Sequence, residues 1–272
     1  MENRTSEKNI LSAKKLFVFD MDGTIYLGNR LFDGTIGFLN YLKETGRNFL
    51  FLTNNSSKDN THYVNKLKKL GIEVTKDDVL TSGEATASYL HSQKPGARVY
   101  LLGTPELESE FKAWGFTLTD ENPDYVVLGF DQTLTYQKLV TACDLIRAGV
   151  TYIATHPDFN CPVENGYIPD TGSMIELIAA STGKRPKVIG KPNKEIIESA
   201  FRKRQYAQNE YAMVGDRLYT DIATGNNAGI CSILVLSGEA TVEDVEQSEV
   251  KPMFMLQDIS VIHENLKKGD QK

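Results

Sequence analysis

The 272-residue sequence lacks the features that mark secreted, zinc-binding and membrane-spanning proteins. Its three cysteines, Cys143, Cys161 and Cys231, lie far apart and form no CxxC pair, so neither a disulfide framework nor a zinc site is expected. No apolar run exceeds about four residues, whereas a membrane-spanning helix needs roughly 18. Residues 1–9 are polar and charged, which is unlike a secretory signal. These absences together favour a reducing, cytoplasmic location.

An excess of positive charge is also missing. The chain has 36 acidic and 30 basic residues and a net charge of −6. Proteins that bind nucleic acids or anionic membranes usually carry a basic face, so neither partner is expected. The hydrophobic and charged fractions, 40% and 24%, are those of an ordinary globular protein. At roughly 150 residues per domain, the length favours two domains.

Short apolar runs alternate with amphipathic segments, which predicts βαβ units and a parallel sheet, the α/β class. Strands are predicted at 16–20, 48–53, 98–102, 125–129, 151–155, 211–215 and 231–236. Helices are predicted at 35–45, 58–70, 105–114, 135–148 and 172–182, after Pro192 and near 221–226. The residues that indicate chemistry lie before residue 57 and after residue 189, so we expect a core domain interrupted by an inserted one.

Two pairs of acidic residues follow two of the predicted strands. Asp20 and Asp22 come at the end of the first strand, and Asp216 and Asp221 follow the strand at 211–215. Ligands of open parallel sheets bind beyond the carboxyl ends of the strands. Carboxylates gathered there repel one another unless a cation lies among them, and a set of oxygen ligands favours Mg²⁺. A single aspartate after a strand would more simply be a turn or cap residue, but the repeated pattern favours a metal site.

Two further segments carry groups suited to an anion. Thr53 and Asn54 follow the second predicted strand and precede a helix, where hydroxyl, amide and backbone N–H groups can bind phosphate. A plain helix cap is the alternative for this segment. Lys191 stands before Pro192, which is expected to begin a helix. Its compact charge suits a phosphate oxygen, although taken alone it would more simply be a solvated lysine.

Taken in order, these segments resemble the motifs of the haloacid dehalogenase-like hydrolase superfamily. They are Asp20-Met21-Asp22-Gly23-Thr24, Thr53-Asn54-Asn55-Ser56, Gly190-Lys191-Pro192 and the run from Gly215 to Asp221. The resemblance implies a Rossmann-like parallel-sheet core at 1–84 and 184–272, with an inserted α/β cap domain at 85–183. The cap is similar to that of the NagD-like branch, which includes 4-nitrophenyl, nucleotide and sugar phosphatases.

The cap departs from the usual pattern of that branch at two positions. In Ala154-Thr155-His156-Pro157-Asp158, a histidine stands where asparagine is common, and Asp170 replaces the first glycine of a P-G-x-G-S run. His156 is therefore a candidate substrate contact, with a surface or structural histidine as the alternative.

The resemblance also implies a mechanism: a Mg²⁺-dependent phosphomonoester hydrolase that acts on a small phosphometabolite through an aspartyl-phosphate. Asp20 would be the nucleophile and Asp22 the general acid and base. The metal would be held by the carboxylates of Asp20 and Asp216 and by the backbone carbonyl of Asp22. Asp221 would hold a metal-bound water or Lys191, with direct ligation as the alternative.

In the same resemblance, Thr53, the Asn54 amide and Lys191 would hold the oxygens of the transferred phosphoryl group. Residues 25–33 are expected to form a small hairpin that turns at Gly28-Asn29. A homodimer formed through the cap is a further expectation. The resemblance does not say which phosphate ester is the substrate.

A receiver-like phospho-accepting signalling module is the alternative function. Such modules also use an acidic pair, an acceptor aspartate, a threonine and a lysine around Mg²⁺. In a receiver the acidic pair comes first and the acceptor lies on a later strand, whereas here Thr53 and Lys191 precede the second acidic pair. Repeated phosphate release from 4-nitrophenyl phosphate would identify an enzyme.

Overall fold

The computed structural model describes residues 10–163 and 165–271, which divide into two compact units. The first unit comprises Met1–Leu52, Val64–Val79 and Ala200–Lys272, and the second comprises Thr53–Tyr63 and Leu80–Ser199. The predicted core domain comprised residues 1–84 and 184–272. In the structure, residues 53–63, 80–84 and 184–199 of that range group with the second unit instead. The assignment of 85–183 as a cap therefore stays a prediction.

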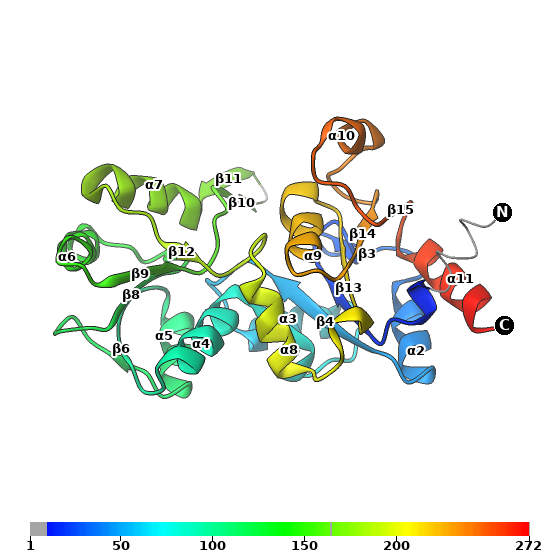
Figure 1. The fold of residues 1–272 in the computed structure, drawn as a ribbon, viewed down its shortest axis with the longest axis horizontal. Helices are drawn as coiled ribbons and strands as arrows, with labels where there is room; N and C mark the ends of the chain where they lie inside the picture. The colour runs from blue at the N-terminus through cyan, green and yellow to red at the C-terminus, as the bar shows by residue number, and fades with distance from the viewer. Residues whose placement is uncertain (1–9, 164, 272) are drawn as a thin grey trace. The chain divides into compact units, whose positions relative to one another are not determined.

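The first unit is built on a six-stranded sheet in the order β15-β14-β13-β1-β4-β5 (Figure 1). Its strands are β1 (Leu16–Phe19), β4 (Asn48–Thr53), β5 (Val79–Thr81), β13 (Tyr211–Gly215), β14 (Cys231–Val235) and β15 (Phe254–Leu256). β1 pairs in parallel with both β13 and β4, so that Leu16 stands opposite Tyr211 and Asn48. β1, β13 and β14 are buried along their whole lengths, as expected for parallel strands covered on both faces.

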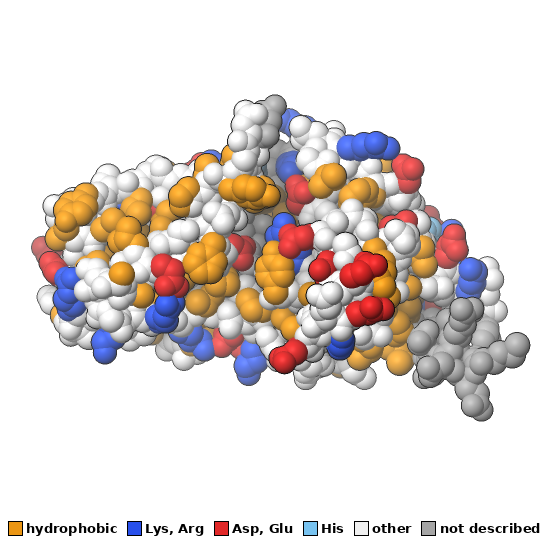
Figure 2. All heavy atoms as spheres, turned by 90° about the horizontal axis from the view of Figure 1, so that it is seen from above, with side chains coloured by type: hydrophobic (Ala, Val, Ile, Leu, Met, Phe, Trp, Pro, Cys, Tyr) orange, Lys and Arg blue, Asp and Glu red, His pale blue; other side chains and the backbone are white. Residues whose placement is uncertain are grey.

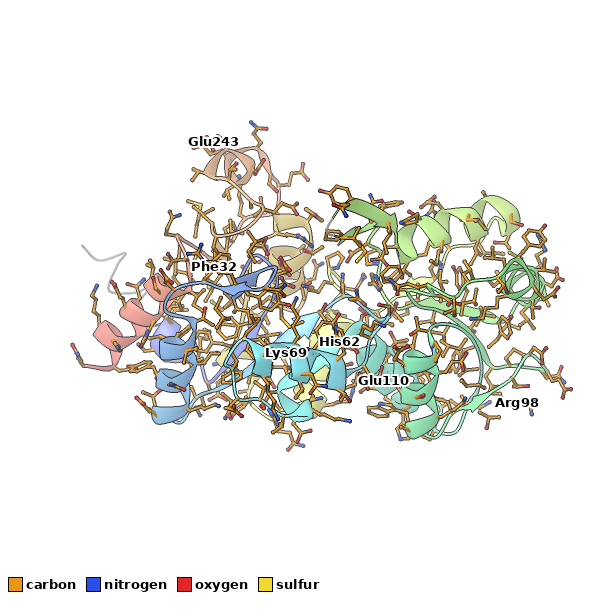
Figure 3. All side chains as sticks on the ribbon, turned by 180° about the vertical axis from the view of Figure 1, so that it is seen from behind. Phe32, His62, Lys69, Arg98, Glu110 and Glu243 are labelled. Carbon is orange, nitrogen blue, oxygen red and sulfur yellow. The ribbon has the colours of Figure 1, made fainter. Side chains whose placement is uncertain are left out.

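Helices and short helical turns connect these strands. They are α2 (Thr35–Glu44), α3 (Asn60–Lys69), α8 (Glu195–Lys203), α9 (Ala223–Asn227), α10 (Val242–Gln247) and α11 (Ile259–Asp270), with η1 (Lys76–Asp78), η2 (Gln208–Glu210) and the π-helical η3 (Leu218–Ile222). α2 packs beside α11, where Phe38 stacks on His263 with ring centroids 5.5 Å apart. Figure 3 shows His62 and Lys69 near opposite ends of α3, and both are exposed.

The second unit has a five-stranded parallel sheet in the order β12-β9-β8-β6-β7. Its strands are β6 (Arg98–Leu102), β7 (Thr117–Leu118), β8 (Tyr125–Leu128), β9 (Thr151–Ala154) and β12 (Lys187–Val188). Its helices are α4 (Ser82–Gln93), α5 (Pro105–Ala113), α6 (Tyr136–Arg147) and α7 (Thr171–Thr182), and β10 (Asn160–Val163) pairs with β11 (Gly166–Pro169) as an antiparallel hairpin. α6 and α7 pack together over a core that includes Val126, Ile146 and Ile178.

Most of the predicted elements are found with ends shifted by a residue or two. The predicted hairpin forms from β2 (Tyr26–Leu27) and β3 (Arg30–Leu31), and Gly28 turns it with a φ of 60°. The prediction of a helix that begins at Pro192 is wrong, because α8 begins only at Glu195. Lys191 and Pro192 are instead joined by a cis peptide bond in a turn.

On the face drawn in Figure 2, lysine and arginine side chains are scattered among acidic, apolar and uncharged ones. Within residues 10–163 and 165–271, no helix is both long and apolar enough to cross a membrane.

Candidate active site

Three carboxylates meet at the carboxyl ends of two neighbouring strands of the first unit. Asp20 follows β1 and Asp216 follows β13, and the parallel pairing of these strands brings the two residues to the same sheet edge. Together with Asp221 from η3, each offers a carboxylate oxygen within 4.8 Å of the others. Asp216 and Asp221 are 2% and 0% exposed. Buried carboxylates this close repel one another strongly, so the group fits a divalent cation, and its oxygen ligands suit Mg²⁺.

The backbone around Asp216 forms a close-fitting cradle for its carboxylate. Thr24 Oγ1 donates to Asp216 Oδ1 at 3.3 Å, and the Glu239 N–H donates to Oδ2 at 2.8 Å. A Cβ added to Gly23 would lie 2.4 Å from Oδ2, and one added to Gly238 would lie 2.1 Å from it. Only glycine leaves room for the carboxylate at these two positions. These contacts therefore fix the position of the Asp216 carboxylate.

Arg217 brings positive charge to the same cluster. Burial opposes the charge of its guanidinium, but the nearby carboxylates of Asp20 and Asp216 outweigh that effect and raise the pKa of Arg217. Its Nε lies 2.8 Å from Glu239 Oε2, and its backbone N–H donates to Asp221 Oδ2 at 3.1 Å. No role for Arg217 was expected from the sequence, although its place directly after Asp216 was a signal.

Asp22 lies outside the carboxylate cluster, and its side chain is exposed. A backbone bridge links it to Tyr26, whose ring lies 4.1 Å from Lys66 Nζ on α3. Burial lowers the pKa of Lys66, while the charge of Asp22 acts to raise it. Nothing in the sequence distinguishes Lys66 from the exposed Lys68 and Lys69 on the same helix. Only the fold brings Lys66 toward Asp22.

The predicted phosphate-binding residues Thr53, Asn54 and Lys191 belong to the second unit. Asn54 Oδ1 accepts from the Lys191 N–H at 2.8 Å, and Asn54 Nδ2 donates to the Lys191 carbonyl at 3.0 Å. Nδ2 also lies 3.2 Å from both carboxylate oxygens of Asp158. Asn54 and Lys191 are 6% and 4% exposed. The Asn54 side chain therefore holds the backbone of Lys191, a contact that could not be predicted from the sequence.

His156 lies in the interior of the second unit and is 0% exposed. Its Nε2 lies 2.9 Å from Asp170 Oδ1, and its Nδ1 lies 2.9 Å from Thr155 Oγ1. Burial favours the neutral ring, but the hydrogen bond and charge of Asp170 outweigh burial and raise the pKa of His156. Both ring nitrogens of His156 thus have protein partners, and its predicted contact with substrate stays a prediction.

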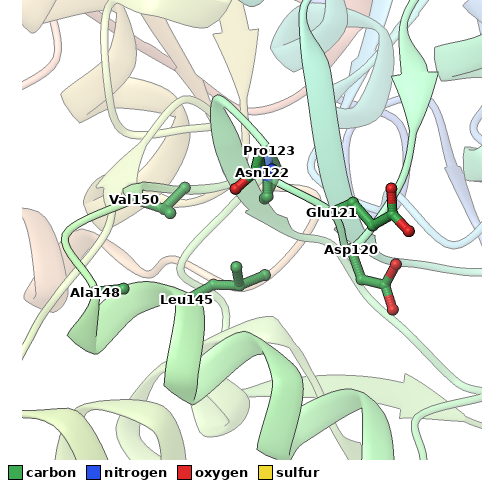
Figure 4. Close-up of a pocket in the computed structure, with 7 residues that line it drawn as sticks. All are labelled: Asp120, Glu121, Asn122, Pro123, Leu145, Ala148 and Val150. Atoms are coloured by element: carbon green, nitrogen blue, oxygen red, sulfur yellow. The ribbon is translucent and has the colours of Figure 1, made fainter.

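A hollow of about 600 Å³ opens elsewhere in the second unit (Figure 4). It is lined by residues 120–123 of one loop and by the apolar side chains of Leu145 on α6 and of Ala148 and Val150 just after that helix. The carboxylates of Asp120 and Glu121 lie on the side away from these apolar residues in Figure 4. None of the predicted site residues lines this hollow.

Comparisons with known proteins agree with the motifs. The family model described as haloacid dehalogenase-like hydrolase matches residues 17–117, and a second model of HAD-like hydrolases matches 188–262. An acid sugar phosphatase of Staphylococcus haemolyticus is 37% identical over 95% of this chain and 98% of its own length.

Solved structures of phosphatases share the fold. The 4-nitrophenylphosphatase of Thermotoga maritima superposes with a TM-score of 0.90 at 48% identity, covering 94% of this chain and 99% of that one. Glycerol phosphate phosphatase of Mycobacterium tuberculosis, solved with magnesium, gives a TM-score of 0.88 at 32% identity, covering 95% and 80% of the two chains. This chain belongs to the haloacid dehalogenase-like hydrolase family.

Proposed function

We propose that this protein is a Mg²⁺-dependent phosphatase that hydrolyses small phosphate monoesters through an aspartyl-phosphate. The observation that carries the proposal is the approach of the Asp20, Asp216 and Asp221 carboxylate oxygens to within 4.8 Å of one another at a sheet edge. The relatives it resembles are named as phosphatases of sugar, glycerol and 4-nitrophenyl phosphates, which supports the same class of substrate.

Asp20 is the nucleophile in this proposal. One of its carboxylate oxygens forms a bond to phosphorus while the bond between phosphorus and the leaving oxygen breaks. Asp22, initially protonated, gives its proton to the leaving alkoxide. Its exposed side chain lies outside the carboxylate cluster, which leaves it able to exchange protons.

The second step returns the enzyme to its starting state. Water attacks the phosphorus of the aspartyl-phosphate, and the bond between phosphorus and the Asp20 oxygen breaks. Asp22 takes a proton from that water, so inorganic phosphate leaves and Asp22 is again protonated. Dividing one slow displacement into two makes a carboxylate an adequate nucleophile.

The carboxylates of Asp20 and Asp216 and the backbone carbonyl of Asp22 would hold the Mg²⁺. The bound ion would neutralise negative charge on the phosphoryl group and on the carboxylates. Asp221 would hold a water molecule bound to the ion rather than the ion itself, with direct ligation as the alternative. The oxygen-only donor set and the cradle of Gly23 and Gly238 around Asp216 both support a hard divalent ion.

Thr53, the backbone N–H of Asn54, and Lys191 would bind the phosphoryl oxygens. The side-chain amide of Asn54 is bonded to the backbone of Lys191, so its part in this proposal is to position Lys191. The ammonium of Lys191 would offset negative charge on the phosphoryl group.

Three of the earlier expectations belong to this proposal. Residues 85–183 would form a cap that selects small substrates, and cap-to-cap contact would form a homodimer. Light scattering on the purified protein tests the dimer. A cytoplasmic location is favoured by three cysteines without disulfides, of which Cys143 and Cys231 are buried. Fractionation of cells that express the protein tests the location.

The test of the function is steady-state hydrolysis of 4-nitrophenyl phosphate. With Mg²⁺ we expect many turnovers per chain, which chelation stops and added Mg²⁺ restores. A receiver-like module would instead accept about one phosphoryl group per chain and release no more. A panel of nucleotides, sugar phosphates and polyol phosphates, compared by kcat/KM, then identifies the preferred ester.

A further inference from the structure

The two positions at which the cap departs from the branch pattern form one buried pair. His156 follows β9 and Asp170 caps the N-terminus of α7, and their Nε2 and Oδ1 atoms lie 2.9 Å apart. His156 is 0% exposed and Asp170 is 4% exposed. A carboxylate buried without a partner is strongly destabilising. The two departures are therefore one feature of the structure, since each residue supplies the partner of the other.

One hydroxyl connects this pair to the Thr53-Asn54 segment. His156 Nδ1 lies 3.4 Å from Ser82 Oγ, and the same hydroxyl donates to the backbone carbonyl of Asn54. His156 Nδ1 also lies 2.9 Å from Thr155 Oγ1, which is in turn 2.9 Å from Ser56 Oγ. The imidazole thus contacts the hydroxyls of Ser82 and Thr155, and each of these is hydrogen-bonded to a residue that follows β4.

The Gly190-Lys191 segment lies directly against His156. The Gly190 N–H donates to the Thr155 carbonyl at 2.7 Å. A Cβ added to Gly190 would lie 2.9 Å from His156 Cβ and 2.8 Å from Asn54 Oδ1. There is no spare room between His156 and the segment that carries Lys191.

Asp170 reaches Asn54 by a second route. Its Oδ1 accepts from the Thr171 N–H at 2.6 Å, which caps α7. The next residue of α7, Gly172, donates its N–H to the Asp158 carbonyl at 2.8 Å. The carboxylate oxygens of Asp158 lie 3.2 Å from Asn54 Nδ2. The pair therefore joins the start of α7 to both phosphate-binding segments of the second unit.

We propose that His156 and Asp170 are positioning residues for phosphate binding, because their hydrogen-bonded pair holds the Thr53-Asn54 and Gly190-Lys191 segments in place. The inference deepens the proposed phosphatase function and rests on it. Neither residue needs to touch the substrate. Misplacing a binding group by about 1 Å can cost 10²-fold in rate, so this positioning affects catalysis.

The charge of the pair affects the same contacts. The charged groups that act on His156 are Asp170, Asp158 and Lys191. The imidazolium donates from both nitrogens, whereas the neutral ring with a proton on Nε2 keeps the Asp170 bond and accepts at Nδ1. Removing the negative charge of Asp170 therefore favours the neutral imidazole. In that form Nδ1 no longer donates and instead accepts a hydrogen bond from a neighbouring hydroxyl.

The experiment uses the full chain and four variants. Asp170→Asn keeps the size and the capping oxygen but removes the charge. His156→Phe keeps a ring and removes both nitrogens, and His156→Gln restores one amide nitrogen that can reach Asp170. Glu176→Gln is the matched control, since Glu176 lies on the same helix α7 in an exposed pair with Arg185 at 2.7 Å.

The readouts are KM and kcat for 4-nitrophenyl phosphate between pH 5 and 9, the inhibition constant for inorganic phosphate, and the melting temperature. His156→Phe and Asp170→Asn should raise both KM and the inhibition constant by roughly tenfold or more. His156→Gln should recover most of that loss, and Glu176→Gln should change neither value. Asp170→Asn should also shift the pH dependence of KM.

The proposal is overturned if folded Asp170→Asn keeps the wild-type KM and inhibition constant across that pH range. It is also overturned if Glu176→Gln weakens phosphate binding as much as Asp170→Asn does. If His156→Phe does not fold, the Asp170→Asn result decides.

A failure of the phosphatase proposal would look different. In that case the wild-type protein would turn over no phosphate ester, and calorimetric titration with inorganic phosphate would replace the kinetics. Weaker binding by Asp170→Asn than by Glu176→Gln would still support the positioning role. Equal binding by the two variants, or no binding by the wild-type protein, would overturn it.

Discussion

Asn54 and Lys191 are joined by two hydrogen bonds although they lie 137 positions apart in the chain. The side-chain oxygen of Asn54 accepts from the Lys191 N–H, and its amide nitrogen donates to the Lys191 carbonyl. An asparagine used in this way replaces a backbone partner and satisfies both polar groups of a buried residue. The lysine proposed to bind phosphate is thus positioned by the residue that follows Thr53.

The first prediction concerns this link. Asn54→Ala should lower kcat/KM by roughly 10–100-fold, because Lys191 loses its fixed position. It should also lower the free energy of unfolding by about 1–3 kcal/mol, because two buried backbone groups lose their partners. Urea unfolding and steady-state kinetics measure the two effects. Asn160→Ala, at an exposed position of β10, is the control and should leave both unchanged.

The second prediction concerns the nucleophile. Asp20→Asn should reduce turnover of 4-nitrophenyl phosphate by roughly 10³-fold or more, because an amide cannot form the phosphoryl-enzyme. The variant should remain folded, since Asp20 is only half-buried. Circular dichroism checks the fold, and rapid quenching after mixing with substrate checks for an acid-stable phosphoryl group on the protein. Turnover at the wild-type rate would show that another residue is the nucleophile.

The third prediction concerns the cradle around Asp216. A methyl group on residue 238 would occupy the space of the Asp216 carboxylate, because the added Cβ would lie 2.1 Å from Oδ2. Gly238→Ala should therefore raise the Mg²⁺ concentration needed for half-maximal activity by roughly 10–100-fold. Gly37→Ala is the control, since a Cβ there would meet only His263, at 4.0 Å, on the exposed side of α2. That control should keep the wild-type Mg²⁺ dependence and slightly stabilise the helix.

The fourth prediction is a pH dependence of stability. The pKa of His156 is raised in the folded protein, because the hydrogen bond and charge of Asp170 outweigh burial. The folded state therefore binds a proton more tightly than the unfolded state. This contribution is fully present below about pH 6.5 and is lost as pH rises through the folded pKa. Each unit of upward shift is worth about 1.4 kcal/mol.

Urea unfolding between pH 6 and 9 measures this contribution. The wild-type protein should lose stability over that range, and His156→Gln should lose less because its side chain does not titrate. A wild-type slope equal to that of His156→Gln would contradict the assignment. Glu176→Gln should follow the wild-type curve.

Much of the first unit was predictable because its signals are local. The apolar run of β1 ends at Asp20, and that of β13 ends at Gly215 directly before Asp216, so the places where these strands end could be read from the residues alone. Gly28, which has a positive φ, likewise marked the turn of the hairpin between β2 and β3. The family motifs carry this same local information.

Other elements gave weaker signals and were not predicted. α4 has a mixed sequence of small and polar residues, and β10 and β11 are short, largely exposed strands with a proline in each. The helix expected at Pro192 was misplaced, because the residues just after the proline form a turn. In these segments tertiary contacts outweigh local propensity.

The amino-acid order alone determined which groups this protein has for chemistry and where along the chain they stand. Strand pairing decided that Asp20 and Asp216 share one sheet edge, since parallel neighbours place their carboxyl ends together. Packing decided that His156 and Asp170 are partners and that Asn54 holds Lys191. Such pairings depend on distances across the fold, and a buried polar group accepts whichever partner the fold brings within about 3 Å.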